Sequence, residues 1–153
     1  MSKRIETVAA VVSFVLVGTT AASASVSLTG PGTIRITDRM VKHLHVDGGK
    51  KGRGAGDIDF YRQSLFNTRV TPSPIGHSDL TCISTGTGSQ SCSGTYFLPK
   101  GKIMVTGVVA SRLFAVLAVV GGTGLYDNAR GTLTATYLGG LPARELLLFR
   151  LVV

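Results

Sequence analysis

The sequence predicts an all-β protein, an eight-stranded antiparallel β-barrel, from three observations. Glycine occurs 20 times in 153 residues, and only 16% of the residues are charged. Val and Thr are frequent, and the segments that they dominate are separated by short stretches containing Gly or Pro, as in strands joined by turns. No segment shows a convincing 3.6-residue period of an amphipathic helix. Eight short strands in succession favour an up-and-down barrel, because a barrel closes its own sheet edges.

The first 24 residues have the features of a secretory signal peptide. Two basic residues near the start precede an apolar stretch over residues 8–17, and Ala22-Ser23-Ala24 places small residues where signal peptidase cleaves. The apolar stretch is about ten residues long, too short to span a bilayer. We therefore expect cleavage after Ala24 and a secreted protein, extracellular or periplasmic, with no transmembrane segment in the mature chain.

The mature chain divides into an N-terminal leader and first-strand region over residues 25–43 and a β-barrel domain over 44–153. Apolar residues at every second position, Ile34 and Ile36 and then Leu44 and Val46, indicate the first strand. The eight expected strands span residues 33–46, 58–66, 75–84, 94–98, 102–110, 114–120, 129–137 and 145–153.

Two of these strands, over residues 114–120 and 146–153, are apolar on both faces. A barrel strand whose outer face meets water should alternate apolar and polar residues. Either a loop of the same chain or another copy of the chain would have to cover such a face, and the sequence favours a homo-oligomer.

Cys82 and Cys92 are the only cysteines. In an exported protein a single pair predicts a disulfide bond, and the alternative is a catalytic thiol at Cys82. His43 and His45 lie on one face of a strand and would be able to share a metal ion, but no third ligand is evident. The sequence therefore predicts neither a metal site nor a cofactor.

The formal charge of +8 raises the question of a nucleic-acid partner. Much of the excess charge lies in a basic cluster made up of Arg35, Arg39, Lys42, Lys50, Lys51 and Arg53. Nucleic-acid binding would require exposed aromatic residues among these basic residues, and none occur in this segment, so no such partner is expected. The basic cluster is either a surface for anionic polymers or a solvated segment.

Two motifs resemble those of a known superfamily, the allene oxide cyclase and dirigent-like barrels. The segment VVGGTGLY over residues 119–126, followed by Ala129-Arg130-Gly131, resembles a signature of plant dirigent proteins. Residues 56–67, followed by Ile75-Gly76 and Cys82, are similar to a stretch of allene oxide cyclases. The resemblance runs from about residue 44 to residue 153.

The resemblance implies an eight-stranded barrel, usually trimeric, with an elongated apolar cavity for a small apolar substrate. Its activity would be that of an isomerase or cyclase, or the dirigent type, in which confinement in a water-poor pocket steers cyclisation or stereoselective coupling. A non-catalytic, lipocalin-like binding barrel and an envelope structural protein remain the alternatives. An ionisable pair facing the interior favours catalysis, an all-apolar interior favours binding, and a filled interior favours the structural role.

The resemblance also implies the catalytic candidates. The water-binding residue of the cyclases falls on Gln63, which turns Asp59 and Tyr61 toward the interior as well. Arg130 lies in the matching Ala-Arg-Gly motif and is either a cation of the pocket or a structural partner of Asp127.

Four further residues are candidates for ligand binding. Leu65 shares the inward face of its strand with Gln63, and Val109 stands where the cyclases have a pocket tyrosine. Tyr96 is either a proton donor or a core residue, and Asp127 is a possible acidic partner of Arg130.

Overall fold

The computed structural model of the protein describes residues 32–49, 52–67, 73–86, 88–111 and 113–152. The expected signal peptide and two lysines of the basic cluster, Lys50 and Lys51, lie outside these ranges. The described part contains no helix that is long and apolar enough to cross a membrane. Its strands are β1 (Gly32–Val46), β2 (Ile58–Phe66), β3 (Gly76–Ser84), β4 (Gln90–Leu98), β5 (Gly101–Val109), β6 (Phe114–Gly124), β7 (Arg130–Gly139) and β8 (Arg144–Val152).

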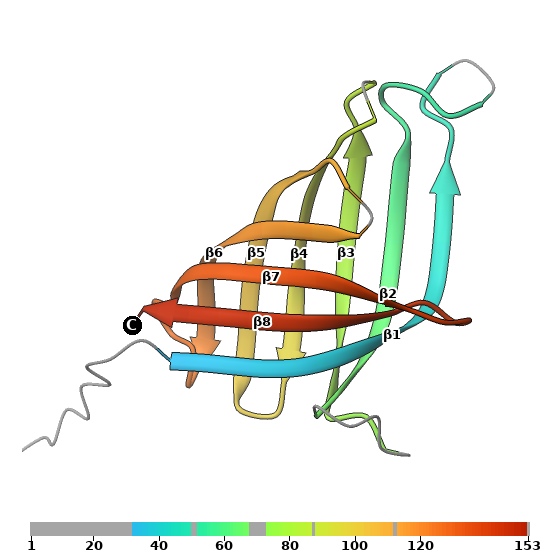
Figure 1. The fold of residues 1–153 in the computed structure, drawn as a ribbon. Coiled ribbons are helices and arrows are strands. Elements are labelled where there is room, and N and C mark those ends of the chain that lie inside the picture. Colours follow the sequence, from blue (N-terminus) through green and yellow to red (C-terminus); the bar gives the residue numbers. More distant parts are fainter. Residues whose placement is uncertain (1–31, 50–51, 68–72, 87, 112, 153) are drawn as a thin grey trace, which may run out of the picture.

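The eight strands form one closed antiparallel barrel in sequence order, which confirms the predicted fold (Figure 1). Each strand pairs with its neighbours in the chain, and the barrel closes where β1 pairs with β8, from Gly32 opposite Leu151 to Thr37 opposite Leu146. The wall of the barrel therefore begins at Gly32, so that residues 32–43 are part of it.

A register shift in β1 decides which of its side chains face the interior. The pairing with β2 slips at residues 40–42, as at a β-bulge. Ile36, before the shift, is buried, whereas Leu44, which the even spacing would place on the same face, is 50% exposed. His43 and His45 point toward the interior instead and reach Asp59 there. One extra residue has exchanged the two faces of the strand.

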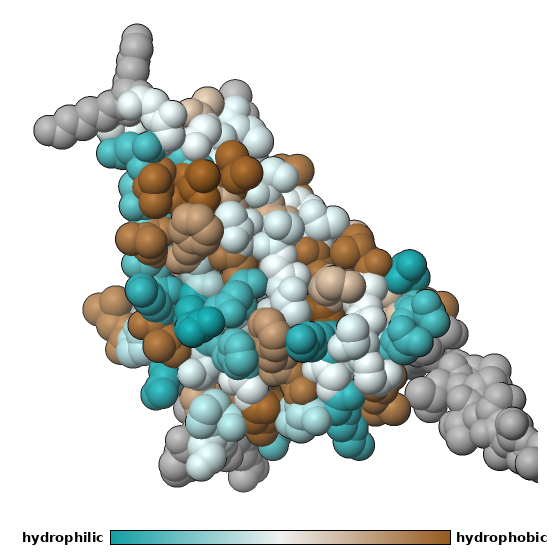
Figure 2. All heavy atoms as spheres, turned by 180° about the vertical axis from the view of Figure 1, so that it is seen from behind, coloured by the Kyte–Doolittle hydropathy of each residue, from teal (hydrophilic) through white to brown (hydrophobic). Residues whose placement is uncertain are grey.

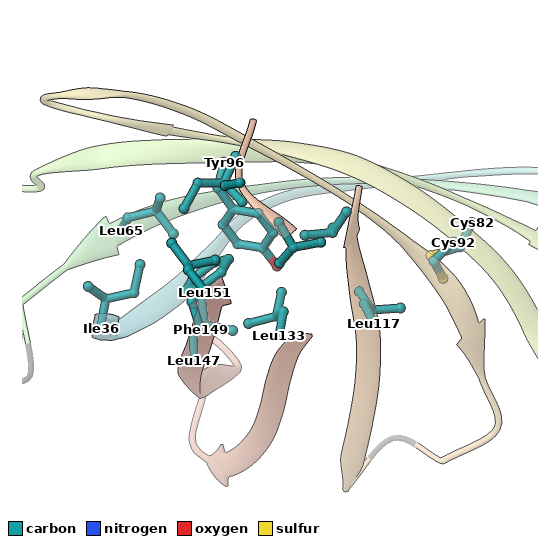
Figure 3. Close-up of a cluster of buried hydrophobic side chains, with 14 residues drawn as sticks. Ile36, Leu65, Cys82, Cys92, Tyr96, Leu117, Leu133, Leu147, Phe149 and Leu151 are labelled. Atoms are coloured by element: carbon teal, nitrogen blue, oxygen red, sulfur yellow. A yellow bond between two sulfur atoms is a disulfide. The ribbon is translucent and has the colours of Figure 1, made fainter. Parts of the chain in front are cut away.

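The apolar core fills one part of the interior (Figure 3). Tyr96, Leu133, Leu147 and Phe149 are buried there, and the rings of Tyr96 and Phe149 meet edge to face with centroids 5.1 Å apart. The elongated apolar cavity that the resemblance implied is therefore occupied by side chains in this part of the barrel. Toward Asp59, the interior residues Tyr61, Leu80 and Val109 are only half-buried.

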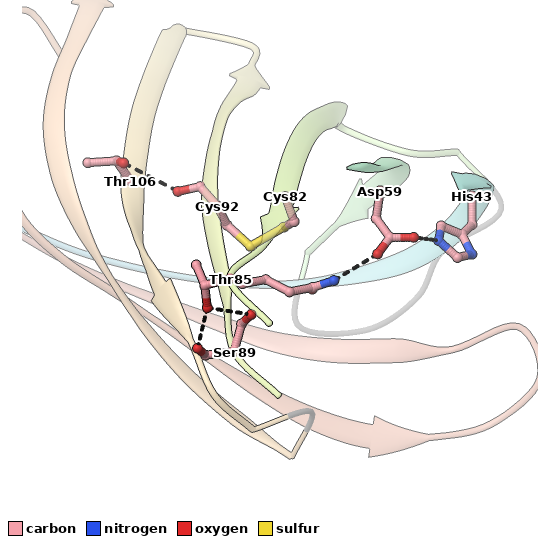
Figure 4. The surroundings of a disulfide bond; sticks show 8 residues. His43, Asp59, Cys82, Thr85, Ser89, Cys92 and Thr106 are labelled. Atoms are coloured by element: carbon pink, nitrogen blue, oxygen red, sulfur yellow. Dashed lines mark hydrogen bonds and ion pairs between the residues drawn. A yellow bond between two sulfur atoms is a disulfide. The ribbon is translucent and has the colours of Figure 1, made fainter. Parts of the chain in front are cut away.

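The predicted disulfide bond is present between Cys82 of β3 and Cys92 of β4 (Figure 4). The two residues are directly opposite in the strand pairing, and both are buried. Closing so short a loop stabilises the fold by about 2.5–3 kcal/mol on the chain-entropy model. Because both sulfur atoms are bonded, Cys82 is not a free thiol.

The outer wall carries many exposed apolar side chains. On β6 the outward residues Phe114, Val116 and Val120 are 53%, 47% and 44% exposed, as the sequence predicted, whereas Leu146 and Leu148 of β8 are half-buried. Figure 2 shows the molecule from behind the view of Figure 1. On this face, apolar side chains gather near one end and hydrophilic side chains lie across the middle. A groove of about 710 Å³ runs over the outer wall, lined by residues from β1 to β6.

Candidate functional site

Five polar side chains from five strands gather inside the otherwise apolar barrel. They are Asp38 of β1, Gln63 of β2, Ser78 of β3, Tyr96 of β4 and Glu145 of β8. Four of them are no more than 5% exposed, and Glu145 is half-buried. We call these five residues the carboxyl cluster, because two of them are acids.

Strand register brings the carboxyl cluster together. Gln63 is opposite Ser78, and Ser78 is opposite Tyr96, so that these three lie in one row across β2, β3 and β4. Barrel closure places β8 beside β1, and there the backbone N–H of Glu145 donates a hydrogen bond of 2.8 Å to Oδ1 of Asp38.

The surroundings of the two acids favour a protonated Asp38. Burial, and after it the negative charge of Glu145, raises the pKa of Asp38 to about 8. Oδ2 of Asp38 is buried and has no hydrogen-bond donor among the described residues. A protonated Asp38 resolves this, because Oδ2 then donates to the Glu145 carboxylate. Burial also raises the pKa of Glu145, although hydrogen bonds from Asp38 and Gln63 oppose the rise.

The other members of the cluster hold these acids in place and keep the site uncharged around them. Ser78 donates a 2.7 Å hydrogen bond to Oε1 of Gln63, which leaves the Gln63 amide group for Glu145. Burial raises the pKa of Tyr96 well above its usual value, and the charges of the two acids add to the effect, so the phenol stays neutral. A carboxyl group that keeps its proton near neutral pH is suited to general acid–base catalysis.

A second polar group lies around Asp59, which is 1% exposed (Figure 4). Oδ1 of Asp59 accepts from His43 Nε2 at 2.7 Å and from His45 Nδ1 at 2.8 Å, and Oδ2 accepts from Gln90 at 2.7 Å. Burial raises the pKa of Asp59, but the three hydrogen bonds outweigh it and leave the pKa below its usual value. Both carboxylate oxygens of Asp59 thus accept hydrogen bonds from neighbouring side chains.

The structure divides the candidate residues between these two groups. Gln63 and Tyr96 belong to the carboxyl cluster, and Leu65 is buried directly opposite Asp38. Asp59 lies in the second group, and Tyr61 is beside it, stacked on the ring of His43 at 4.7 Å. Val109, the last of the interior candidates, is half-buried opposite Gln90.

Arg130 and Asp127 do not join either group. Both are exposed, and the guanidinium of Arg130 donates to the backbone oxygen of Ala129 at 2.9 Å. No ion pair joins Arg130 to Asp127, although the structure describes both residues. Neither of the two roles expected for Arg130, a cation of the pocket or a partner of Asp127, is found, because the inward positions of β7 are those in phase with Leu133, one residue out of step with Arg130.

Sequence reasoning missed both acids of the carboxyl cluster. Glu145 is in phase with Leu147, Phe149 and Leu151, the buried residues of its strand, and Asp38 is in phase with Ile36. A carboxylate in phase with the apolar face of a strand was the available signal.

The raised pKa of Asp38 predicts a stability that falls with pH. The folded protein binds more protons than the unfolded chain between pH 3.8, the reference value, and about pH 8. The resulting stabilisation is complete below this window and is lost as the pH rises through 8. Asp38→Asn keeps the hydrogen bonds without the titration, so its unfolding free energy should decline less over this window than that of the wild type.

Urea unfolding followed by circular dichroism measures this difference, since the chain has no tryptophan. Asp79→Asn, which removes an acid on the outer wall, is the control and should keep the decline. Equal pH dependence in the wild type and Asp38→Asn would contradict the raised pKa of Asp38.

No protein-family model matches the chain, and no curated protein is similar to it in sequence. Several solved structures are similar in fold. A pyocyanin demethylase superposes with a TM-score of 0.68 over 79% of this chain and 100% of its own, at 24% identity.

Two further structures extend the comparison. A pterocarpan synthase dirigent protein has a TM-score of 0.64 over 80% of this chain and 83% of its own, at 12% identity. An exo-specific intermolecular Diels-Alderase has a TM-score of 0.63 over 79% of this chain and 98% of its own, at 13% identity. Similarities this low in sequence establish the fold alone, an eight-stranded antiparallel barrel that this chain shares with these structures.

Proposed function

We propose that the protein is a secreted barrel that binds a small, largely apolar substrate and steers its cyclisation or stereoselective coupling. The observation that carries the proposal is the pair of acids, Asp38 and Glu145, inside an apolar interior. Burying a carboxyl group costs several kcal/mol unless it is neutral or paired, so a barrel that only packs has little reason to hold two. Dirigent proteins and Diels-Alderases among the similar structures support the same class of reaction.

The pair suits a substrate with a conjugated carbonyl group, such as an enone or a quinone methide. Glu145 is the partly exposed member of the cluster and the one a substrate can reach, while Asp38 behind it holds the proton that the pair donates. The acid pair gives a proton to the carbonyl oxygen as the new ring bond forms, and a proton released from the substrate restores the pair. No electrons are gained or lost, and apolar residues such as Leu133 and Phe149 keep water from the reacting atoms.

This mechanism predicts that the acids are needed for turnover and not for binding. Glu145→Gln and Asp38→Asn should each lower turnover by about 10²-fold or more, since general acid–base catalysis contributes that much. Substrate binding and the melting temperature should change little, because the amides keep the shape and most hydrogen bonds. Product formation from a panel of conjugated carbonyl compounds, followed by chiral liquid chromatography and mass spectrometry, measures the effect.

Asp79→Asn, which breaks the ion pair with Arg62 on the outer wall, is the matched control and should keep full turnover. If a substrate binds with equal affinity to all variants and no reaction is observed with any compound, the protein is a binding barrel. If the acid variants lose turnover only in proportion to lost folded protein, the pair is structural.

Export is part of this proposal, supported by the basic and apolar start of the chain and by the disulfide bond between Cys82 and Cys92. The mature protein recovered from the periplasm or the medium should begin at Ser25 and contain no free thiol. Intact mass before and after alkylation tests both points. A full-length chain, or one that alkylates without reduction, would refute export by this route.

We also propose that the outer face of β6 is covered by another copy of the chain in a homo-oligomer, which the resemblance implies is a trimer. Its support is the exposure of Phe114, Val116 and Val120 on one strand. Val116→Lys should dissociate the oligomer, because a charge at a packed apolar contact would lose its solvation. Sedimentation velocity measures the mass, Asp127→Lys in an exposed turn is the control, and a wild-type monomer at micromolar concentration would contradict the assembly.

A further inference from the structure

One nitrogen of His45 faces two carboxylates at the end of the barrel where β1 leads into β2. Nε2 of His45 is 3.1 Å from Oδ1 of Asp47 and 3.8 Å from Oδ2 of Asp57. All three atoms lie within 4.8 Å of one another. Ligand atoms that bind one first-row metal at about 2.0–2.1 Å are themselves roughly 3–3.5 Å apart, so these separations are close to those of a ligand set.

The orientation of the His45 ring is fixed by a hydrogen bond to the buried carboxylate of Asp59. Its Nδ1 is 2.8 Å from Oδ1 of Asp59, and since a carboxylate only accepts, Nδ1 carries the hydrogen. Asp59 is 1% exposed and is itself held by His43 and Gln90. A buried carboxylate that holds one nitrogen of an imidazole directs the other nitrogen outward, which is how histidine ligands of metals are positioned.

The carboxylate of Asp57 is also pre-positioned. It is 2% exposed and accepts backbone N–H groups from Gly48 at 3.0 Å and from Gly54 at 2.6 Å. These bonds fix both ends of the carboxylate while Oδ2 stays turned toward His45. Asp47, which is 49% exposed, is the most exposed of the three ligands and marks the side from which an ion would enter.

The charges at this end of the barrel call for a cation. Asp47, Asp57 and Asp59 bring three negative charges, while the imidazoles of His43 and His45 are, among the residues that the structure describes, the basic groups in direct contact with them. A neutral His45 would turn its Nε2 lone pair toward two carboxylates, which is repulsive unless a proton or a metal ion lies between them. A divalent metal ion would neutralise more of the negative charge of these carboxylates than a proton would.

We propose that His45, Asp47 and Asp57 form a binding site for a first-row divalent cation of the zinc class, with Asp59 as the positioning residue for His45. The imidazole nitrogen favours zinc over calcium or magnesium, which take oxygen ligands. Solvent supplies the remaining ligands on the exposed side. The ion ties Asp47, which follows β1, to Asp57, which precedes β2. The site shares no residue with the carboxyl cluster and stands independently of the proposed function.

Calorimetric titration of the full mature chain with zinc chloride tests the site. One zinc ion per chain is expected, with affinity at least 10-fold weaker in His45→Asn and in Asp47→Asn. Asp59→Asn should weaken binding by about 10- to 100-fold, as changes to groups behind a metal ligand do. The matched controls are His77→Asn and Asp79→Asn, which alter a surface His–Asp pair 3.9 Å apart, and both should bind zinc like the wild type.

A second measurement detects the effect of the bound ion on the chain between β1 and β2. Arg53 lies between Asp47 and Asp57 and is exposed, so trypsin can cleave after it. Zinc should slow this cleavage several-fold in the wild type and in Asp38→Asn, and not in Asp47→Asn. The proposal is overturned if zinc does not bind, if the variants at His45 and Asp47 bind as tightly as the wild type, or if the His77 and Asp79 variants lose binding equally. Circular dichroism confirms that each variant is folded.

Discussion

Closure of the barrel by the pairing of β1 with β8 is the constraint on which the rest of the structure depends. It joins the two ends of the chain, so that the backbone of Glu145 bonds to the side chain of Asp38 across 107 residues of sequence. The same closure encloses Leu147 and Phe149 and removes the open edges of the sheet. Without it, neither acid would be shielded from water, and burial would not raise the pKa of Asp38.

The β-bulge in β1 gives the barrel two polar ends of different character. Before residues 40–42, β1 contributes Asp38 to the carboxyl cluster, and after them it contributes His43 and His45 to the group around Asp59. A regular strand would have turned these histidines outward. One end thus holds an acid whose pKa is raised by burial, and the other holds a carboxylate whose pKa is lowered by imidazole and amide hydrogen bonds.

The interior between these ends is not an open channel. Tyr96, Leu133 and Phe149 fill it, and solvent reaches mainly the half-buried residues near Asp59 and the side chain of Glu145. A barrel with this interior can confine only a small substrate, or one whose entry shifts apolar side chains. Confinement of that kind is the physical basis on which a barrel of this fold would select one ring-forming geometry.

The sequence by itself determined the fold class, the strand positions and the inward face of β2. The match of residues 56–67 to the cyclase stretch, together with strand alternation, correctly turned Asp59, Gln63 and Leu65 inward, and the presence of only two cysteines correctly paired Cys82 with Cys92. Only the tertiary structure decided which polar residues meet. The bulge reversed the faces of β1, Arg130 proved to be outside, and the partners Asp38 and Glu145 are far apart in the chain. Alternation tells which side of a wall a residue faces, but the register of a closed barrel sets what stands across from it.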